Sequence, residues 1–268
     1  MDKKHPNEIR TAVRHKYAEV AKDDSTDCGC SPSPSCCGDP TVSLTDLGTL
    51  TGYSQEELTG VPQGSNMGLG CGNPQAIAAL KPGETVLDLG SGGGFDCFLA
   101  ARQVGETGQV IGVDMTADMI AKARENALKG DYSNVEFRLG EIEHIPAADA
   151  SVDVIISNCV INLSPQKMDV FREAYRILKP GGRLAISDVV ATAPLPPELK
   201  NDPDLLSACV SGAATVVEIT AMLQETGFQD IQIQPKDESR ELIREWVPGK
   251  NVQDYIVSAN IEAIKPKE

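Results

Sequence analysis

Three cysteines stand where a thiol could do chemistry. Cys71 lies between two glycines in the polar segment GLGCGNP, which is a poor place for a core side chain. Cys159 follows the apolar run VDVIIS, and Cys209 lies in LLSACVSGA in the C-terminal part of the chain. Each alone could be a small buried hydrophobic residue, which is the ordinary role of a free cysteine. If the three thiols meet, they form a soft pocket, because thiolates select soft acceptors.

The elements that would position these thiols have the pattern of an α/β sheet. Apolar strands alternate with helical segments, which is typical of a parallel sheet with helices on both faces. In such a sheet, ligands bind at the edge formed by the carboxyl ends of the strands, and Cys159 stands at that edge. Cys71 can reach the same edge, whereas Cys209 has to fold back to it. The expected strands are 84–90, 108–115, 135–140, 152–158 and 183–190, and the expected helices are 95–104, 116–129 and 164–182.

The chain departs from this alternation at both ends, which suggests three parts. Residues 1–73 combine a predicted helix at 7–22 with a loop rich in cysteine, proline, glycine and serine. Residues 74–193 carry the Rossmann-like alternation and should bind a cofactor. Residues 194–268 hold helical stretches and two predicted strands, and we expect a small α+β domain that binds the substrate.

The composition excludes several classes of function. The formal net charge is −15, so the surface repels nucleic acids and anionic membranes, and we expect neither as a partner. No apolar run approaches the ~20 residues of a membrane span, and MDKKHPNEIR lacks the apolar core of a signal peptide. We therefore expect a cytoplasmic protein with mostly reduced thiols. Its eight cysteines then favour metal, redox or catalytic roles over structural disulfides.

The segment VLDLGSGGGFD, at 86–96, reads as a strand, a glycine-rich turn and the start of a helix. Such a turn brings backbone amides close to a ligand. Gly90 and Gly92 fit the dinucleotide fingerprint G-x-G-x-x-G, but Phe95 occupies the third glycine position. Two acids belong to this pattern: Asp88 stands two residues before the first glycine, and Asp114 ends the next predicted strand. An NAD-binding Rossmann domain is the alternative at this point.

This pattern resembles the class I S-adenosylmethionine-dependent methyltransferases, which share four such segments in the same order. The resemblance implies that Asp114 binds both ribose hydroxyls and that Asp88 supports the methionine end. It also implies that LGEIEHIP, at 139–146, places Glu141 and Ile142 beside the adenine ring. The cofactor-binding residues expected from it are Asp88, Gly90, Ser91, Gly92, Gly94, Asp114, Met115, Glu141, Ile142 and Asn158.

A methyltransferase with a thiolate pocket suggests a thiophilic substrate, and trivalent arsenic fits. The segments GLGCGNP, LDLGSGGGFDCF, ISNCVINLSP and CVSGA resemble those of the arsenite S-adenosylmethionine methyltransferases. That resemblance implies that Cys71, Cys159 and Cys209 bind the arsenic. It implies arsenite and methylated arsenicals as substrates and products in arsenic detoxification. It also implies a thiol reductant of the glutathione or thioredoxin type, with thioredoxin as a protein partner.

The N-terminal cysteine cluster leaves several roles open. Cys28, Cys30, Cys36 and Cys37 could capture arsenite, relay disulfides, bind Zn²⁺ or do little, and their spacing departs from that of zinc sites. Some members of the resembled family form a disulfide between the Cys71 position and a further N-terminal cysteine, a role for Cys36 or Cys37 or neither. Two other functions also stay open: methylation of carbon or oxygen in a small metabolite such as a quinone, and non-enzymatic sequestration of a metalloid by thiols.

Overall fold

One mixed sheet forms the centre of the computed structural model, which describes residues 5–22, 43–200 and 202–267. Five of its strands run parallel to one another, and two C-terminal strands extend the sheet through successive antiparallel pairings. The strand order is β3-β2-β1-β4-β5-β8-β7, and a short strand, β6, pairs with β5 off this path. The strands are β1 (Thr85–Leu89), β2 (Gln109–Asp114), β3 (Val135–Leu139), β4 (Val152–Asn158), β5 (Leu178–Ala191), β6 (Ala214–Thr215), β7 (Gln229–Lys236) and β8 (Ile256–Ile264).

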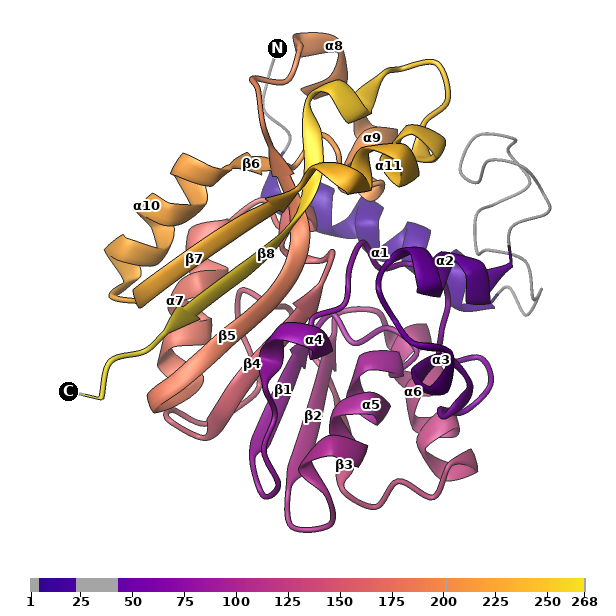
Figure 1. The fold of residues 1–268 in the computed structure, drawn as a ribbon, viewed down its shortest axis with the longest axis vertical. Coiled ribbons are helices and arrows are strands. Elements are labelled where there is room, and N and C mark those ends of the chain that lie inside the picture. The colour runs from indigo at the N-terminus through magenta and orange to yellow at the C-terminus, as the bar shows by residue number, and fades with distance from the viewer. Residues whose placement is uncertain (1–4, 23–42, 201, 268) are drawn as a thin grey trace.

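Helices cover both faces of this sheet (Figure 1). The central helices are α4 (Gln75–Ala78), α5 (Phe95–Val104), α6 (Ala117–Lys129) and α7 (Lys167–Ile177). The N-terminal ones are α1 (Pro6–Lys22), α2 (Leu44–Leu50) and α3 (Gln55–Thr59). The C-terminal ones are α8 (Pro197–Lys200), α9 (Pro203–Ser207), α10 (Val216–Thr226) and α11 (Arg240–Trp246). This arrangement confirms the expected class I methyltransferase architecture. No helix of the described chain is long and apolar enough to cross a membrane.

Two hydrophobic cores lie on opposite faces of the sheet, because successive side chains of a strand point to opposite sides. On β1, Leu87 packs into the core with Phe171 of α7, whereas Val86 packs into the core with Phe98 of α5. All four side chains are buried. Burial on both faces explains why the parallel strands read as nearly continuous apolar runs in the sequence.

The C-terminal strands extend the central sheet. β8 pairs with β5 in an unbroken register from Ile256 opposite Ala191 to Ile264 opposite Arg183, and β7 pairs with β8. The two strands expected near 230–234 and 255–263 are therefore confirmed, and they lie beside the strands of the central part. The division of the chain at residues 73 and 193 stays a prediction.

The N-terminal helix α1 is fastened to the sheet's carboxyl edge by a buried ion pair. The Nε of Arg10 donates to an oxygen of Glu143 at 3.2 Å, and both side chains are almost fully buried. The same guanidinium donates to Gln166 at 2.6 Å, and Ser164 donates to Glu143 at 2.6 Å. Arg14, which is 43% exposed, pairs with Glu141 at 2.9 Å one turn further along.

We expect Arg10→Ala to loosen α1, because it leaves the buried Glu143 carboxylate without its cationic partner. Breaking a buried pair in this way costs about 3–5 kcal/mol. Hydrogen–deuterium exchange over residues 6–22 measures the effect as faster exchange of the helix amides. Arg14→Ala is the matched control, because a half-exposed pair contributes only about 0–1 kcal/mol. Equal effects of the two substitutions would contradict the assignment.

Candidate active site

A cleft opens at the carboxyl ends of β1, β2 and β4, with α1 forming part of the opposite wall. Asp88 and Asp114 line it from the first two strands, and Asn158 and Cys159 line it from the third. Tyr17 contributes from α1. This is the edge at which the sequence predicted a ligand, and it is where open α/β sheets bind their ligands.

The glycine turn exposes its backbone to this cleft. Gly90 has φ 72°, and a Cβ there would lie 2.4 Å from the Val160 side chain. Gly92 has φ 49°, and a Cβ there would point into open space. Among the described residues, the buried Ser91 hydroxyl has no hydrogen-bond partner. The turn therefore leaves room and polar capacity for a ligand.

Asp114 is held so that its carboxylate can receive a pair of hydroxyls. The Gly92 amide donates to Oδ2 at 3.0 Å, and the Thr116 amide donates to Oδ1 at 2.8 Å. Each oxygen keeps a second lone pair, which suits two adjacent ribose hydroxyls. Burial raises the pKa of this carboxyl, and the two amides partly offset the rise.

Asp88 is buried beside the thiol of Cys97. The Cys97 thiol packs in the core under α5, but it also donates to Asp88 Oδ2 at 3.3 Å. Burial, and then the charge of Asp96, raise the pKa of Asp88 well above its usual value. A cationic group bound in the cleft would favour the ionised form.

Most of the expected cofactor residues line the cleft, but two do not. Gly94, with φ 93°, precedes α5, and a Cβ there would meet Phe98 and Phe137. Glu141 pairs with Arg14, while Glu143, which sequence reasoning did not single out, lines the cleft. The expected residues in the lining are Asp88, Gly90, Ser91, Gly92, Asp114, Met115, Ile142 and Asn158.

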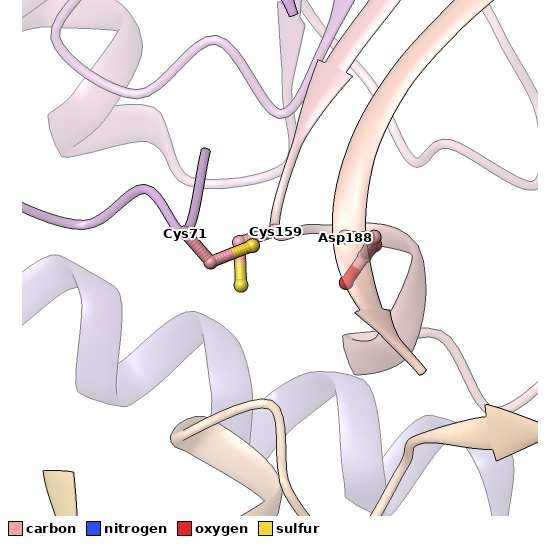
Figure 2. A group of neighbouring side chains, drawn as sticks. All are labelled: Cys71, Cys159 and Asp188. Atoms are coloured by element: carbon pink, nitrogen blue, oxygen red, sulfur yellow. The ribbon is translucent and has the colours of Figure 1, made fainter. Parts of the chain in front are cut away.

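The structure brings Cys71, Cys159 and Cys209 together in one buried cluster, and Cys159 also lines the cleft. The sulfur atoms of Cys71 and Cys159 and one carboxyl oxygen of Asp188 all lie within 4.8 Å of one another (Figure 2). The Cys209 thiol donates to the Cys159 carbonyl oxygen at 3.0 Å. All three cysteines are buried in a single apolar cluster that includes Val189. Cys36 and Cys37, the other expected arsenic ligands, lie outside the described residues, as do Cys28 and Cys30.

Two of these cysteines sit in left-handed turns, which direct their side chains toward the cluster. Cys159 has φ 59°, and its amide donates to the Ser187 carbonyl at 2.8 Å immediately after β4 ends. Cys209 has φ 58° just beyond α9. Residues other than glycine rarely adopt this conformation, and it is typical of functional sites.

The surroundings of Cys71 and Cys159 favour the neutral form of both thiols. Hydrogen bonds with Cys209 and Cys71, and then burial, raise the pKa of Cys159 well above its usual value. Burial also raises the pKa of Cys71. Nearby, burial raises the pKa of Asp188 to about 6. Backbone amides of Val189 and Ile161 hydrogen-bond the Asp188 carboxyl.

Asp96 forms a second buried carboxyl site, which sequence reasoning missed. It accepts hydrogen bonds from the Tyr53 hydroxyl at 2.8 Å, from Asn158 at 3.3 Å and from Gln75 at 3.4 Å. Burial raises its pKa to about 6 despite these donors. Its partners come from three distant segments, so no local pattern in the sequence could have revealed the site.

We expect Asp96→Asn to remove a pH dependence of stability. The folded-state pKa of Asp96 is about 6, against an ordinary value of 3.8. Between these values the folded state binds more protons than the unfolded chain, so the free energy of unfolding falls as pH rises. The shift from 3.8 to about 6 corresponds to roughly 3 kcal/mol.

Urea unfolding of both proteins at about pH 4 and about pH 7 measures this effect. Over that interval, the wild type should lose about 3 kcal/mol more stability than Asp96→Asn. Comparing the two proteins removes the contributions of acids that do not interact with Asp96. The contribution of Asp88 changes with the substitution, because the charge of Asp96 raises the pKa of Asp88. Parallel pH dependences would show that Asp96 ionises with its ordinary pKa.

The chain is similar to a known methyltransferase family in sequence. A family model described as "Methyltransferase domain" matches residues 80–227. An arsenite methyltransferase of Halobacterium salinarum is 54% identical over 97% of this chain and 68% of its own length. One from Aquipseudomonas alcaligenes is 41% identical over 83% of this chain and 62% of its own length.

A solved structure agrees with these sequence relatives. It is the crystal structure of an arsenic(III) S-adenosylmethionine methyltransferase from Chlamydomonas reinhardtii, which is 34% identical to this chain. The two superpose with a TM-score of 0.59 over 84% of this chain and 73% of that one. This chain therefore belongs to the arsenite methyltransferase family of class I methyltransferases.

Proposed function

We propose that this protein transfers methyl groups from S-adenosylmethionine to trivalent arsenic held by Cys71, Cys159 and Cys209. The observation that carries the proposal is the meeting of three buried thiols beside the cofactor cleft. A methyltransferase for carbon or oxygen needs no such trio, and a protein that only sequesters metalloids needs no cofactor cleft.

The residues of the cleft suit S-adenosylmethionine. Asp114 would hold the ribose hydroxyls with the free lone pairs of its carboxylate. The glycine turn and the Asp88 carboxyl would hold the methionine end, and Ile142 would contact the adenine. When bound, the cofactor supplies a methyl group on a positively charged sulfur. Burial of Asp88 strengthens its attraction for that cationic end, because the local dielectric is low.

The thiols can take up arsenite without a separate base. Each As–OH bond exchanges for an As–S bond, and the thiol proton leaves with the hydroxide as water. The raised pKa values of Cys71 and Cys159 keep those protons available for this exchange. Three such exchanges give arsenic bound by three sulfurs with its lone pair retained, and that lone pair is the nucleophile.

Each methylation calls for a reductant. When the lone pair forms the As–C bond, the methyl–sulfur bond of the cofactor breaks, and arsenic becomes formally pentavalent. Arsenic returns to the trivalent state when one bound thiolate leaves it and forms a disulfide with a second thiol, so each added methyl group replaces one thiolate ligand. In the first methylation the leaving thiolate would be that of Cys71, and Cys36 or Cys37 would supply the second thiol. We propose that a cytoplasmic reductant of the glutathione or thioredoxin type then reduces this disulfide.

This stepwise loss of ligands predicts unequal roles for the three cysteines. Cys159→Ser and Cys209→Ser should abolish both the first and the second methylation, because both thiols hold inorganic and monomethylated arsenic. Cys71→Ser should mainly slow the first. In each case we expect the methylation rate to fall by at least roughly 10- to 100-fold, which is the cost of losing an outer-shell partner at a metal site.

One assay tests the proposal and these roles together. Purified protein is incubated with S-adenosylmethionine, a thiol reductant and either arsenite or methylarsenite, and the arsenic species are separated by chromatography and quantified by mass spectrometry. Methylated arsenic from the wild type supports the proposal. Cofactor binding without methylated arsenic would favour a carbon- or oxygen-directed enzyme, and arsenic binding without cofactor binding would favour sequestration. Normal methylation of arsenite by Cys71→Ser would refute the role given to that residue.

A further inference from the structure

The side-chain amide of Asn158 holds the segment that carries Cys71. Its Oδ1 accepts a hydrogen bond from the Cys71 amide at 3.0 Å, and its Nδ2 donates to the Gly72 carbonyl at 2.8 Å. One asparagine therefore pairs with backbone groups of two successive residues. Asn158 immediately precedes Cys159, so the same residue links two of the three thiol-bearing segments.

The rest of this amide is occupied by a second pair of protein groups. Nδ2 has two hydrogens, and the one that does not bond Gly72 is shared between the Tyr53 hydroxyl at 3.0 Å and Asp96 Oδ2 at 3.3 Å. Tyr53 in turn donates to Asp96 Oδ1 at 2.8 Å. Although Asn158 lines the cleft, its polar atoms are engaged by the protein, which argues against a main role in binding the cofactor.

A small number of contacts fix the Cys71 segment. Residues 69–73 form neither helix nor strand, so their backbone polar groups need partners from outside the segment. Besides the bonds to Asn158, the Ser258 hydroxyl donates to the Cys71 carbonyl at 2.8 Å, and the Cys71 thiol donates to the Ser187 carbonyl at 3.8 Å. The Asn73 side chain donates to the Gly52 carbonyl at 3.1 Å. The approach to Asn158 is close: a Cβ at Gly70 would lie 2.6 Å from Nδ2. A side chain at position 70 would therefore collide with the Asn158 amide, and glycine avoids this collision.

We infer that Asn158 is a positioning residue that places the Cys71 thiol for the arsenic ligand exchange at the three-cysteine site. The inference rests on the proposed function, and it adds a specific consequence. Inorganic arsenite uses Cys71, whereas monomethylated arsenic is held by Cys159 and Cys209. Loss of the Asn158 amide should therefore weaken the binding of arsenite selectively.

The test measures binding in the absence of cofactor and turnover. Full-length protein with serine at positions 28, 30, 36 and 37 is dialysed to equilibrium against arsenite or methylarsenite, and bound arsenic is quantified by mass spectrometry. Asn158→Ala should weaken arsenite binding by about tenfold, because it leaves the Cys71 amide and the Gly72 carbonyl without a partner. Methylarsenite binding should change by less than about twofold.

Matched variants define the scale of the effect. Cys71→Ser sets the loss expected when the third ligand is absent. Asn134→Ala is the control, because its amide also donates to two backbone carbonyls, those of Ala101 and Gly105, away from the cleft. It should bind both arsenicals as the parent does. Gly70→Ala attacks the same contact from the other side and should reproduce the selective loss even if Asn158→Ala does not fold.

Three results would overturn the inference. One is an equal loss of arsenite and methylarsenite binding in Asn158→Ala or in Gly70→Ala. Another is unchanged arsenite binding in either variant. The last is a loss of S-adenosylmethionine affinity, measured by calorimetry, as large as the loss of arsenite affinity, because that result would make Asn158 a cofactor ligand. Failure of the proposed function is distinguishable, since it appears as arsenite binding by the wild type without methylated product.

Discussion

Three buried thiols from distant segments lie together at the carboxyl edge of the sheet, and the proposed arsenic site depends on this convergence. Cys71 comes from an irregular segment before β1, Cys159 from the end of β4 and Cys209 from beyond α9. No one element could carry all three. The left-handed turns at Cys159 and Cys209 aim two of the side chains, and the Asn158 amide secures the segment of the third.

The electrostatics of the cleft follow from the same packing. Asp88 and Asp96 are buried and Asp114 is half-buried near them, and removal from water raises the pKa of each carboxyl. Gathering acids in this way destabilises the empty cleft, since each ionised carboxylate lacks a cation nearby. A positively charged cofactor removes this electrostatic cost. The stability that the empty protein lacks therefore appears as affinity for the cofactor. The buried Arg10–Glu143 pair holds helix α1 at the opposite wall of this cleft.

Sequence reasoning located the parts of the site that follow a local pattern. The glycine turn, Asp114 at the end of a strand and Cys159 at the sheet edge all follow from apolar runs and their boundaries. The convergence of Cys209 did not, because it depends on contacts across 50 residues. The same holds for Arg10, whose partner Glu143 is 133 residues away, and for Tyr53 with Asp96. Buried polar pairs of this kind form between segments that only the tertiary fold brings together. Hydrophobic periodicity and turn residues are local patterns, so they cannot predict such pairs.

The measurement that tests the central claim most directly is arsenic X-ray absorption spectroscopy on the arsenite-bound protein with serine at positions 28, 30, 36 and 37. A three-thiol site predicts one arsenic per chain with three sulfur neighbours and no oxygen. It also predicts two sulfurs and one carbon when methylarsenite is bound. Arsenic that keeps its oxygen neighbours, or that shows the same coordination after Cys209→Ser, would contradict a three-thiol site.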